Sequence, residues 1–212
     1  MDGDDEVFAA IAHERRKLAD YLDGLTAQQW QVRSLCTEWT CRDIAAHLVM
    51  PLVTSTPVFA WQMLKALGNF NRANLALTAA TAQRFEGRLP SELRERAESR
   101  FTPPGFGPLA PLTDLIVHGL DIRVPLAGSD APAWQPTDPK LLVTVLDFLT
   151  EPAAAKSFGT GAHGVGLVAT DVSWWHGSGP AVEGTAEEII LVMTGRAGAA
   201  TGLTGDGVAS LR

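Results

Sequence analysis

The chain has 212 residues, of which 46% are hydrophobic and 19% are charged, and its 24 acidic and 17 basic residues give a formal net charge of -7. This length and composition are typical of a soluble globular protein with one large or two small domains. A net acidic chain without a basic run lacks the charge pattern of proteins that bind nucleic acid or anionic lipid. Its longest apolar stretches fall short of the roughly 20 residues needed to span a bilayer.

The first residues are acidic (Met1–Glu6), whereas a secretory signal is basic and then apolar. We therefore expect a cytoplasmic protein. The two cysteines, Cys36 and Cys41, are too few for a disulfide framework, which agrees with a reducing compartment.

The first two thirds of the chain is predicted to be helical. Apolar periodicity and helix-breaking residues predict helices over 5–22, 59–67, 71–85, 90–101, 111–124 and 139–149. A further helix is predicted to start at Thr40, because Thr40 and Asp43 match the capping signature of a hydroxyl residue followed three positions later by an acid. Pro51 and Pro57 are expected to limit or kink the chain that follows. The charged helix over 90–101 is predicted to form a solvent-exposed outer face.

The composition changes after Pro152. A strand is predicted over 165–175, a turn over 176–179, and a second strand over 181–183 that pairs back as a hairpin. A helix is predicted over 185–193, and the tail contains a tight turn and a short strand. We therefore predict a mostly helical bundle domain over 1–152 and a small α+β domain over 153–212.

Three polar residues on apolar helices are candidate metal ligands. Asp114 and His118 lie four positions apart on one predicted helix, so their side chains share a face. Asp114 is surrounded by apolar residues, and a buried carboxylate needs a hydrogen-bonding, charged or metal partner. His47 is likewise a lone polar residue on its helix, and two helices of a bundle can bring three such side chains together.

Two histidines and one carboxylate leave coordination positions open, which is typical of catalytic rather than structural zinc sites. Nickel or iron fits the same ligands. Asp121 follows His118 by one turn and is predicted to orient it through its second ring nitrogen. Spacing also leaves a second interpretation open, in which the helices do not meet and the three side chains are hydrogen-bonded core residues.

Two other motifs are interpreted as structural. The segment Gly159–Gly164 matches G-x-G-x-x-G, but a dinucleotide site needs a strand before it and a helix after it. Here a strand is predicted to follow, so the segment is interpreted as a flexible loop. A zinc finger built on Cys36, Cys41 and His47 lacks a second Cys/His pair, and Cys41 is interpreted as a small buried residue.

The segment Leu35–Leu48 resembles the signature of the mycothiol-dependent maleylpyruvate isomerase family, in which a Trp-Thr-x-x-Asp-x-x-x-His run carries the first zinc ligand. The segment Asp114–Asp121 resembles the family's second motif, acid-x-x-x-His-x-x-Asp, and Asp171–Leu211 is similar to its small C-terminal domain. The resemblance implies a DinB-like four-helix bundle followed by a small α+β domain, an actinobacterial source, and a divalent metal, expected to be zinc, on the three ligands named above. The isomerase itself is expected to have Glu where this chain has Asp114.

The resemblance also implies an activity. We expect a metal-dependent enzyme that uses a low-molecular-weight thiol such as mycothiol and a small-molecule substrate, as an isomerase or an S-transferase, in a monomer or homodimer. Arg196 resembles an arginine near the family's active site that could hold a carboxylate. It is equally explained as a solvated arginine favoured by a helix dipole. The alternative function is a non-catalytic module that binds a metal or an apolar ligand, with a structural or vestigial metal site.

Overall fold

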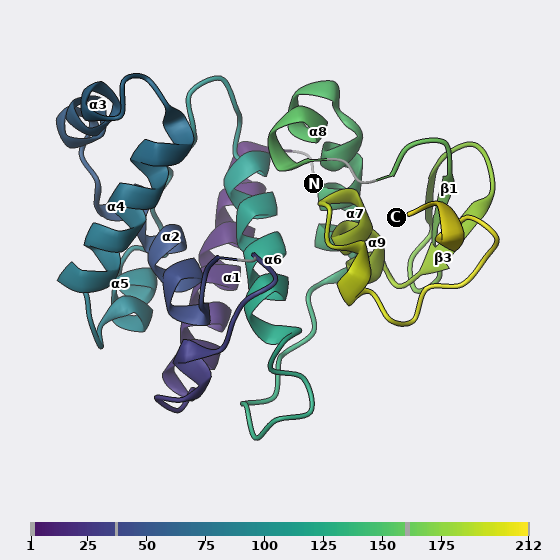
Figure 1. Ribbon diagram of the computed structural model, residues 1–212, viewed down its shortest axis with the longest axis horizontal. Coiled ribbons are helices and arrows are strands. Elements are labelled where there is room, and N and C mark those ends of the chain that lie inside the picture. The colour runs from purple at the N-terminus through teal and green to yellow at the C-terminus, as the bar shows by residue number, and fades with distance from the viewer. Residues whose placement is uncertain (1–2, 37, 160–161, 212) are drawn as a thin grey trace. The chain divides into compact units, whose positions relative to one another are not determined.

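The computed structural model describes residues 3–36, 38–159 and 162–211 (Figure 1). The chain divides into two compact units, one of residues 4–134 and one built mainly from residue 135 to the C-terminus. In the second unit, helix α7 (Pro139–Thr150) packs against α8 (Pro152–Phe158) and α9 (Ala186–Met193). The domain boundary predicted after residue 152 thus lies one helix further along the chain than this division.

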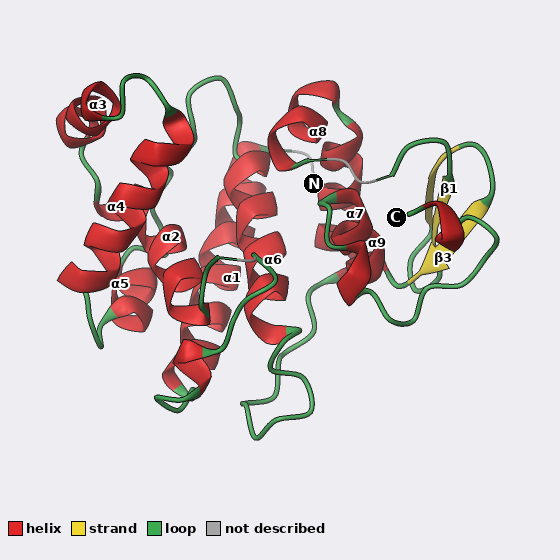
Figure 2. Cartoon of the chain, in the orientation of Figure 1, coloured by secondary structure: helices red, strands yellow, loops and turns green. Residues whose placement is uncertain are grey.

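The N-terminal unit is helical (Figure 2). Its helices are α1 (Asp4–Asp23), α2 (Cys41–Val53), α3 (Thr56–Lys65), α4 (Phe70–Arg84), α5 (Leu89–Glu95) and α6 (Leu109–Arg123), with a short 3-10 helix, η1 (Gln29–Gln31). Helix α2 packs against α4, α5 and α6, and α1 packs against α5 and α6. Pro51 does not end α2, which continues to Val53, while Pro57 lies in the first turn of α3.

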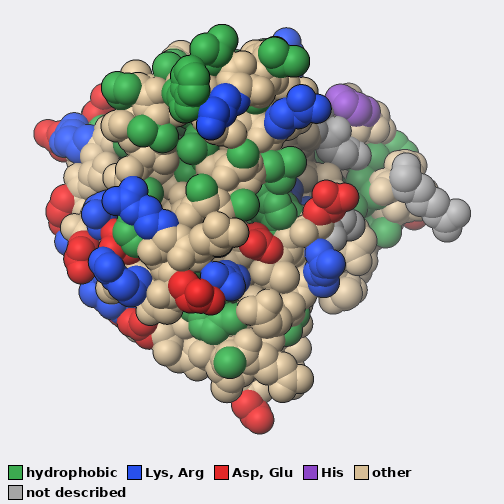
Figure 3. All heavy atoms as spheres, turned by 60° about the vertical axis from the view of Figure 1, so that its left-hand side comes forward, with side chains coloured by type: hydrophobic (Ala, Val, Ile, Leu, Met, Phe, Trp, Pro, Cys, Tyr) green, Lys and Arg blue, Asp and Glu red, His purple; other side chains and the backbone are tan. Residues whose placement is uncertain are grey.

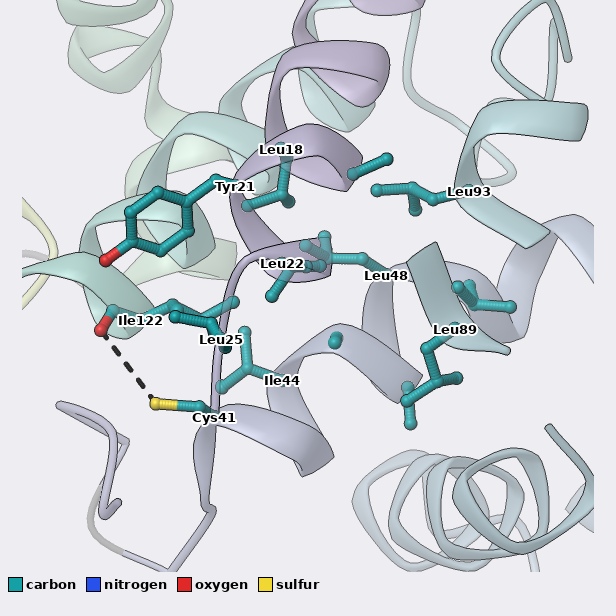
Figure 4. Packing of buried hydrophobic residues seen from close by; sticks show 14 of the residues in the cluster. Leu18, Tyr21, Leu22, Leu25, Cys41, Ile44, Leu48, Leu89, Leu93 and Ile122 are labelled. Atoms are coloured by element: carbon teal, nitrogen blue, oxygen red, sulfur yellow. Dashed lines mark hydrogen bonds between the residues drawn. The ribbon is translucent and has the colours of Figure 1, made fainter. Parts of the chain in front are cut away.

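Leucine and isoleucine side chains fill the interior of this bundle (Figure 4). They repeat every four residues, the spacing that places side chains on one face of a helix: Leu18 and Leu22 on α1, Ile44 and Leu48 on α2, Leu89 and Leu93 on α5. Cys41 is fully buried among them, as predicted, and its Sγ lies 3.9 Å from the carbonyl oxygen of Ile122. The start of α2 is thereby packed against the end of α6.

The charged segment that was predicted to be one exposed helix is different in the structure. Helix α5 ends at Glu95, and Glu92 is only 1% exposed because it pairs with Arg88 at 2.5 Å. Arg15 on α1 donates hydrogen bonds to the carbonyl oxygens of Ala97 and Ser99, at 2.9 and 2.7 Å. The prediction of a solvent-exposed face was wrong for Glu92, whose charge is satisfied by partners inside the protein, which helical periodicity does not reveal. Glu95, Glu98 and Arg100 are exposed.

Helix α3 contributes little to the core, since it has no buried residue. Its apolar side chains Val58, Trp61 and Leu64 are between 50 and 66% exposed. Figure 3 shows hydrophobic side chains gathered on the face of the molecule that includes this helix.

The C-terminal unit contains a small sheet of β1 (Gly166–Ala169), β2 (Trp174–Gly177) and β3 (Ala181–Gly184), in the order β2-β1-β3. Strand β2 is antiparallel to β1, and β3 is parallel to it. The single strand predicted over 165–175 is therefore wrong, because the chain turns between β1 and β2. The predicted hairpin is also wrong, because β3 pairs with β1.

A glycine permits this topology. Between β2 and β3 the chain crosses the end of β1, and Gly179 adopts a φ of 126° there. A Cβ atom at Gly179 would lie 2.3 Å from the carbonyl oxygen of Gly164. Only glycine combines that backbone conformation with so close an approach.

Helix α9 covers this sheet and begins with a capping box formed by Thr185 and Glu188. Helix α8 was not predicted from the sequence. Residues 160–161 of the predicted glycine-rich loop lie outside the described residues, and strand β1 follows that segment as expected. None of the helices in the described ranges combines the length and hydropathy that crossing a bilayer requires.

Candidate metal centre

His47, Asp114 and His118 come together where α2 packs against α6. His47 lies in the second turn of α2, and the other two residues lie one turn apart on α6. The two helices do meet, which spacing alone left open.

The residues that precede His47 start its helix and pack its ring. Thr40 and Asp43 form a capping box, in which the Asp43 carboxylate accepts hydrogen bonds from the backbone nitrogen and the hydroxyl of Thr40, at 2.9 and 2.7 Å. The ring of Trp39 lies 5.1 Å from the ring of His47, centroid to centroid. The Trp-Thr-x-x-Asp-x-x-x-His pattern therefore contains one candidate ligand and three residues that place it.

The distances within the triad suit an ion better than direct hydrogen bonds. Nε2 of His47 lies 3.6 Å from Oδ2 of Asp114, and Nε2 of His118 lies 3.4 Å from Oδ1 of the same carboxylate. These separations exceed the hydrogen-bond range of about 2.7–3.2 Å. They are close to the distance of about 3.3–3.5 Å between two ligands of a tetrahedral ion held at about 2.0–2.1 Å. The shorter side chain of Asp114 still reaches between the two imidazoles.

The electrostatics of the triad also favour a cation. Burial alone raises the pKa of Asp114, but the positive charge and polar contact of the nearby His118 and His47 imidazoles outweigh it, so the pKa is lowered. Burial opposes the charged form of His118, yet Asp114 and Asp121 raise its pKa well above the ordinary value. An ionised carboxylate thus lies between two imidazoles, and a divalent ion can take the place of the bound proton. The Asp114 side chain is 33% exposed, so solvent reaches the triad.

Asp121, the residue predicted to orient His118, lies in contact with it. Its side chain is fully buried, and its Oδ2 accepts a hydrogen bond from Nδ1 of His118 at 2.8 Å. With Nδ1 engaged, Nε2 is the ring nitrogen that faces Asp114. His47 differs, because within the described ranges its buried Nδ1 has no hydrogen-bond partner.

Sequence reasoning missed Cys36 at this site. Its Sγ lies 3.2 Å from Oδ2 of Asp121. The two residues are 85 positions apart, so no local sequence pattern indicates this contact. Cys36, His118 and Asp121 form a second cluster of metal-ligating residue types. Its distances of 2.8 and 3.2 Å are those of hydrogen bonds, and the carboxylate oxygen is shared between the two donors. This cluster is therefore a hydrogen-bonded support for the triad.

Arg196, the predicted anion-binding residue, belongs to the C-terminal unit. It follows α9, its backbone nitrogen donates to the carbonyl oxygen of Leu191 at 2.7 Å, and its guanidinium donates to that of Thr194 at 2.6 Å. These contacts anchor the end of the helix. A role in binding a substrate anion remains a prediction.

The fold and the site together define a class of protein. The chain is a DinB-like four-helix bundle followed by a small α+β domain, with candidate ligands on two bundle helices, and solved structures of similar fold confirm this architecture. The crystal structure of the mycothiol-dependent maleylpyruvate isomerase has a TM-score of 0.53, and that of a His-to-Ala mutant has 0.51. Each is 15% identical in sequence, over 96% of this chain and 93% of its own.

The family is established by sequence. The family model described as the mycothiol maleylpyruvate isomerase N-terminal domain matches residues 11–123, more than half of the chain. The chain belongs to this family, as its motifs predicted. None of the curated proteins matches it.

Proposed function

We propose that this protein is a divalent-metal-dependent enzyme of the maleylpyruvate isomerase type that uses mycothiol or a similar low-molecular-weight thiol. The observation that carries the proposal is the triad of His47, Asp114 and His118, whose candidate donor atoms lie within 4.8 Å of one another and whose two Nε2 atoms lie 3.6 and 3.4 Å from the Asp114 carboxylate oxygens. Three protein ligands leave a coordination position for a thiol or substrate, which is the arrangement of catalytic rather than structural zinc sites. Zinc is the expected ion, and nickel and iron fit the same donors.

The residues of the chain have distinct roles in this proposal. Asp114 supplies the negative charge, and His47 and His118 supply neutral nitrogen donors. Asp121 keeps Nε2 of His118 directed at Asp114 through its hydrogen bond to Nδ1. A bound ion would supply Lewis acidity, stabilising a thiolate or polarising a carbonyl of the substrate at neutral pH.

Two reactions use such a site. Isomerisation of maleylpyruvate adds a thiol to a carbon–carbon double bond, allows rotation about the resulting single bond, and eliminates the thiol. Transfer of a thiol to an acceptor shares the first step. Maleylpyruvate carries carboxylates, and Arg196 is our candidate to bind one of them.

The proposal is tested first by elemental analysis of the purified protein, made with zinc, nickel and iron supplied. We expect about one metal ion per chain, and loss of the ion in Asp114→Ala and His118→Ala. His13→Ala, which removes an exposed histidine on α1, is the matched control and should retain the ion. Absence of metal above background from the wild-type protein would overturn the proposal.

The second test is turnover of maleylpyruvate with and without mycothiol, in the metal-loaded wild type and the same variants. Thiol-dependent isomerisation that is lost in His118→Ala supports the isomerase, and thiol conjugation without isomerisation supports the transferase. If metal is bound but folding and ligand binding survive chelation and no reaction occurs, the protein is the alternative, a non-catalytic binding module.

A further inference from the structure

The loop before α2 is fixed onto the end of α6. The backbone nitrogen of Leu35 donates to the carbonyl oxygen of Asp121 at 3.2 Å. Ser34 holds the turn, because its backbone nitrogen and its hydroxyl both bond the carbonyl oxygen of Trp39, at 2.9 and 2.8 Å. The backbone nitrogen of Cys36 in turn donates to the Ser34 hydroxyl at 3.2 Å. This network determines where the Cys36 side chain lies.

At that position the thiol meets the carboxylate that supports the metal triad. Sγ of Cys36 lies 3.2 Å from Oδ2 of Asp121, and the same oxygen lies 2.8 Å from Nδ1 of His118. Asp121 is fully buried, so a donor that is lost there is not simply replaced by bulk water. Two donors on one carboxylate oxygen restrict rotation of the carboxylate more than one donor does.

We propose that Cys36 is a positioning residue for His118. Its S–H donates to Oδ2 of Asp121 and holds the carboxylate in the orientation that accepts the Nδ1 hydrogen of His118, so that Nε2 is directed at Asp114. Cys36 does not share an ion with the triad, because it lies on the Nδ1 side of the His118 ring and the triad uses Nε2. The inference rests on the proposed metal site and adds a third residue to the chain of contacts that supports it.

The size of the effect can be judged from residues that hydrogen-bond a histidine ligand and orient it. Replacing such a partner typically weakens metal binding by about 10- to 100-fold. Cys36 supports Asp121, which remains as the partner of Nδ1 when the thiol is removed, so we expect the lower end of that range. Cys36→Ala should weaken zinc binding by about 10-fold. Cys36→Ser keeps a donor at the same place and should bind zinc within about threefold of the wild type.

The experiment measures the zinc dissociation constant by competition with a chelator for wild type, Cys36→Ala, Cys36→Ser and Cys41→Ala. Cys41 is the matched control, since it is a second thiol that is buried near the start of α2 and is not part of either ligand cluster. Cys41→Ala should lower the melting temperature and leave the zinc affinity unchanged. Cobalt(II) absorption gives a second readout, because reorientation of His118 moves the visible ligand-field bands.

Three results would overturn the inference. One is a Cys36→Ala protein whose zinc affinity lies within threefold of the wild type. Another is a Cys36→Ser protein that binds as weakly as Cys36→Ala. The third is a thiolate-to-cobalt charge-transfer band that disappears in Cys36→Ala, which would make Cys36 a ligand.

Failure of the metal site itself is distinguishable. If the wild type binds no metal, the proposed function fails, and the contact is judged from the ring nitrogen resonances of His118 in the metal-free protein. Cys36→Ala should shift those resonances and Cys41→Ala should not. Unchanged resonances in Cys36→Ala would overturn the positioning role independently of any metal.

Discussion

Replacing Asp121 with Asn removes one negative charge from a fully buried position and preserves the shape of the side chain. The 2.8 Å hydrogen bond to Nδ1 of His118 becomes a bond to a neutral amide oxygen, and charge-assisted bonds are roughly twice as strong as neutral ones. The His118 imidazole therefore becomes less basic, and its ring is held less firmly in the orientation that directs Nε2 at Asp114. We therefore expect Asp121→Asn to weaken zinc binding by about 10- to 100-fold, which corresponds to about 1.4–2.8 kcal/mol.

The assay is chelator competition at constant pH, with Asp147→Asn as the control. Asp147 also accepts a hydrogen bond from an aromatic ring nitrogen, Nε1 of Trp174, at 2.8 Å. It lies on α7 and belongs to neither cluster of candidate ligands. Asp147→Asn should therefore change the melting temperature and leave zinc binding unchanged. A zinc affinity of Asp121→Asn within twofold of the wild type would refute the argument that Asp121 orients a metal ligand.

Three further predictions concern the scaffold. Leu22→Ala, at a side chain 1% exposed in the bundle core, should lower the free energy of unfolding by about 2–5 kcal/mol in urea, and an effect below 1 kcal/mol would contradict the packing described. Thr40→Ala should cost about 1 kcal/mol by removing the N-cap of the helix that carries His47, and Thr40→Ser should restore most of it. Burial raises the pKa of the Cys41 thiol to about 11 from an ordinary value of 9.0. Because the folded protein holds this proton more tightly, stability should fall between pH 9 and 11, and the fall should be smaller in Cys41→Ala; equal pH profiles would refute the assignment.

The parts of the site that are local in sequence could be predicted, and the parts that join distant segments could not. Asp114 and His118 share a helix face by their spacing, and Thr40 and Asp43 announce the start of α2. The meeting of α2 with α6 depends on core packing around Ile44 and on the whole topology between them. It entered the prediction only through resemblance to a family.

Cys36 shows the limit most clearly. Its contact with Asp121 spans 85 positions, and nothing in the residues around either side chain indicates a partner. The C-terminal sheet shows a related limit. The glycines near β2 suggested turns, but hydropathy does not indicate whether β3 pairs with β2 or crosses to β1. The crossing brings the backbone so close at Gly179 that only glycine fits there.

The same lack of local information explains why the burial of Glu92 on α5 was not predicted. Its charges predicted a surface, because a sequence pattern counts charges and does not show which are paired. Glu92 is buried with its arginine partners. Arg15, on α1, donates hydrogen bonds to carbonyl oxygens just after the end of α5.

The placement of the triad on α2 and α6 has a topological consequence. His47 and Asp114 are 67 positions apart, and α3, α4 and α5 all lie in the chain between them. In the proposed metal-loaded protein, an ion bound to both residues acts as a reversible cross-link that closes this long loop. A permanent cross-link over a loop of that length would reduce the entropy of the unfolded chain by an amount worth about 4 kcal/mol. Metal loss would then lower the free energy of unfolding of the bundle, including three helices that contain none of the ligands, and metal supply would set the stability of the fold as well as its chemistry.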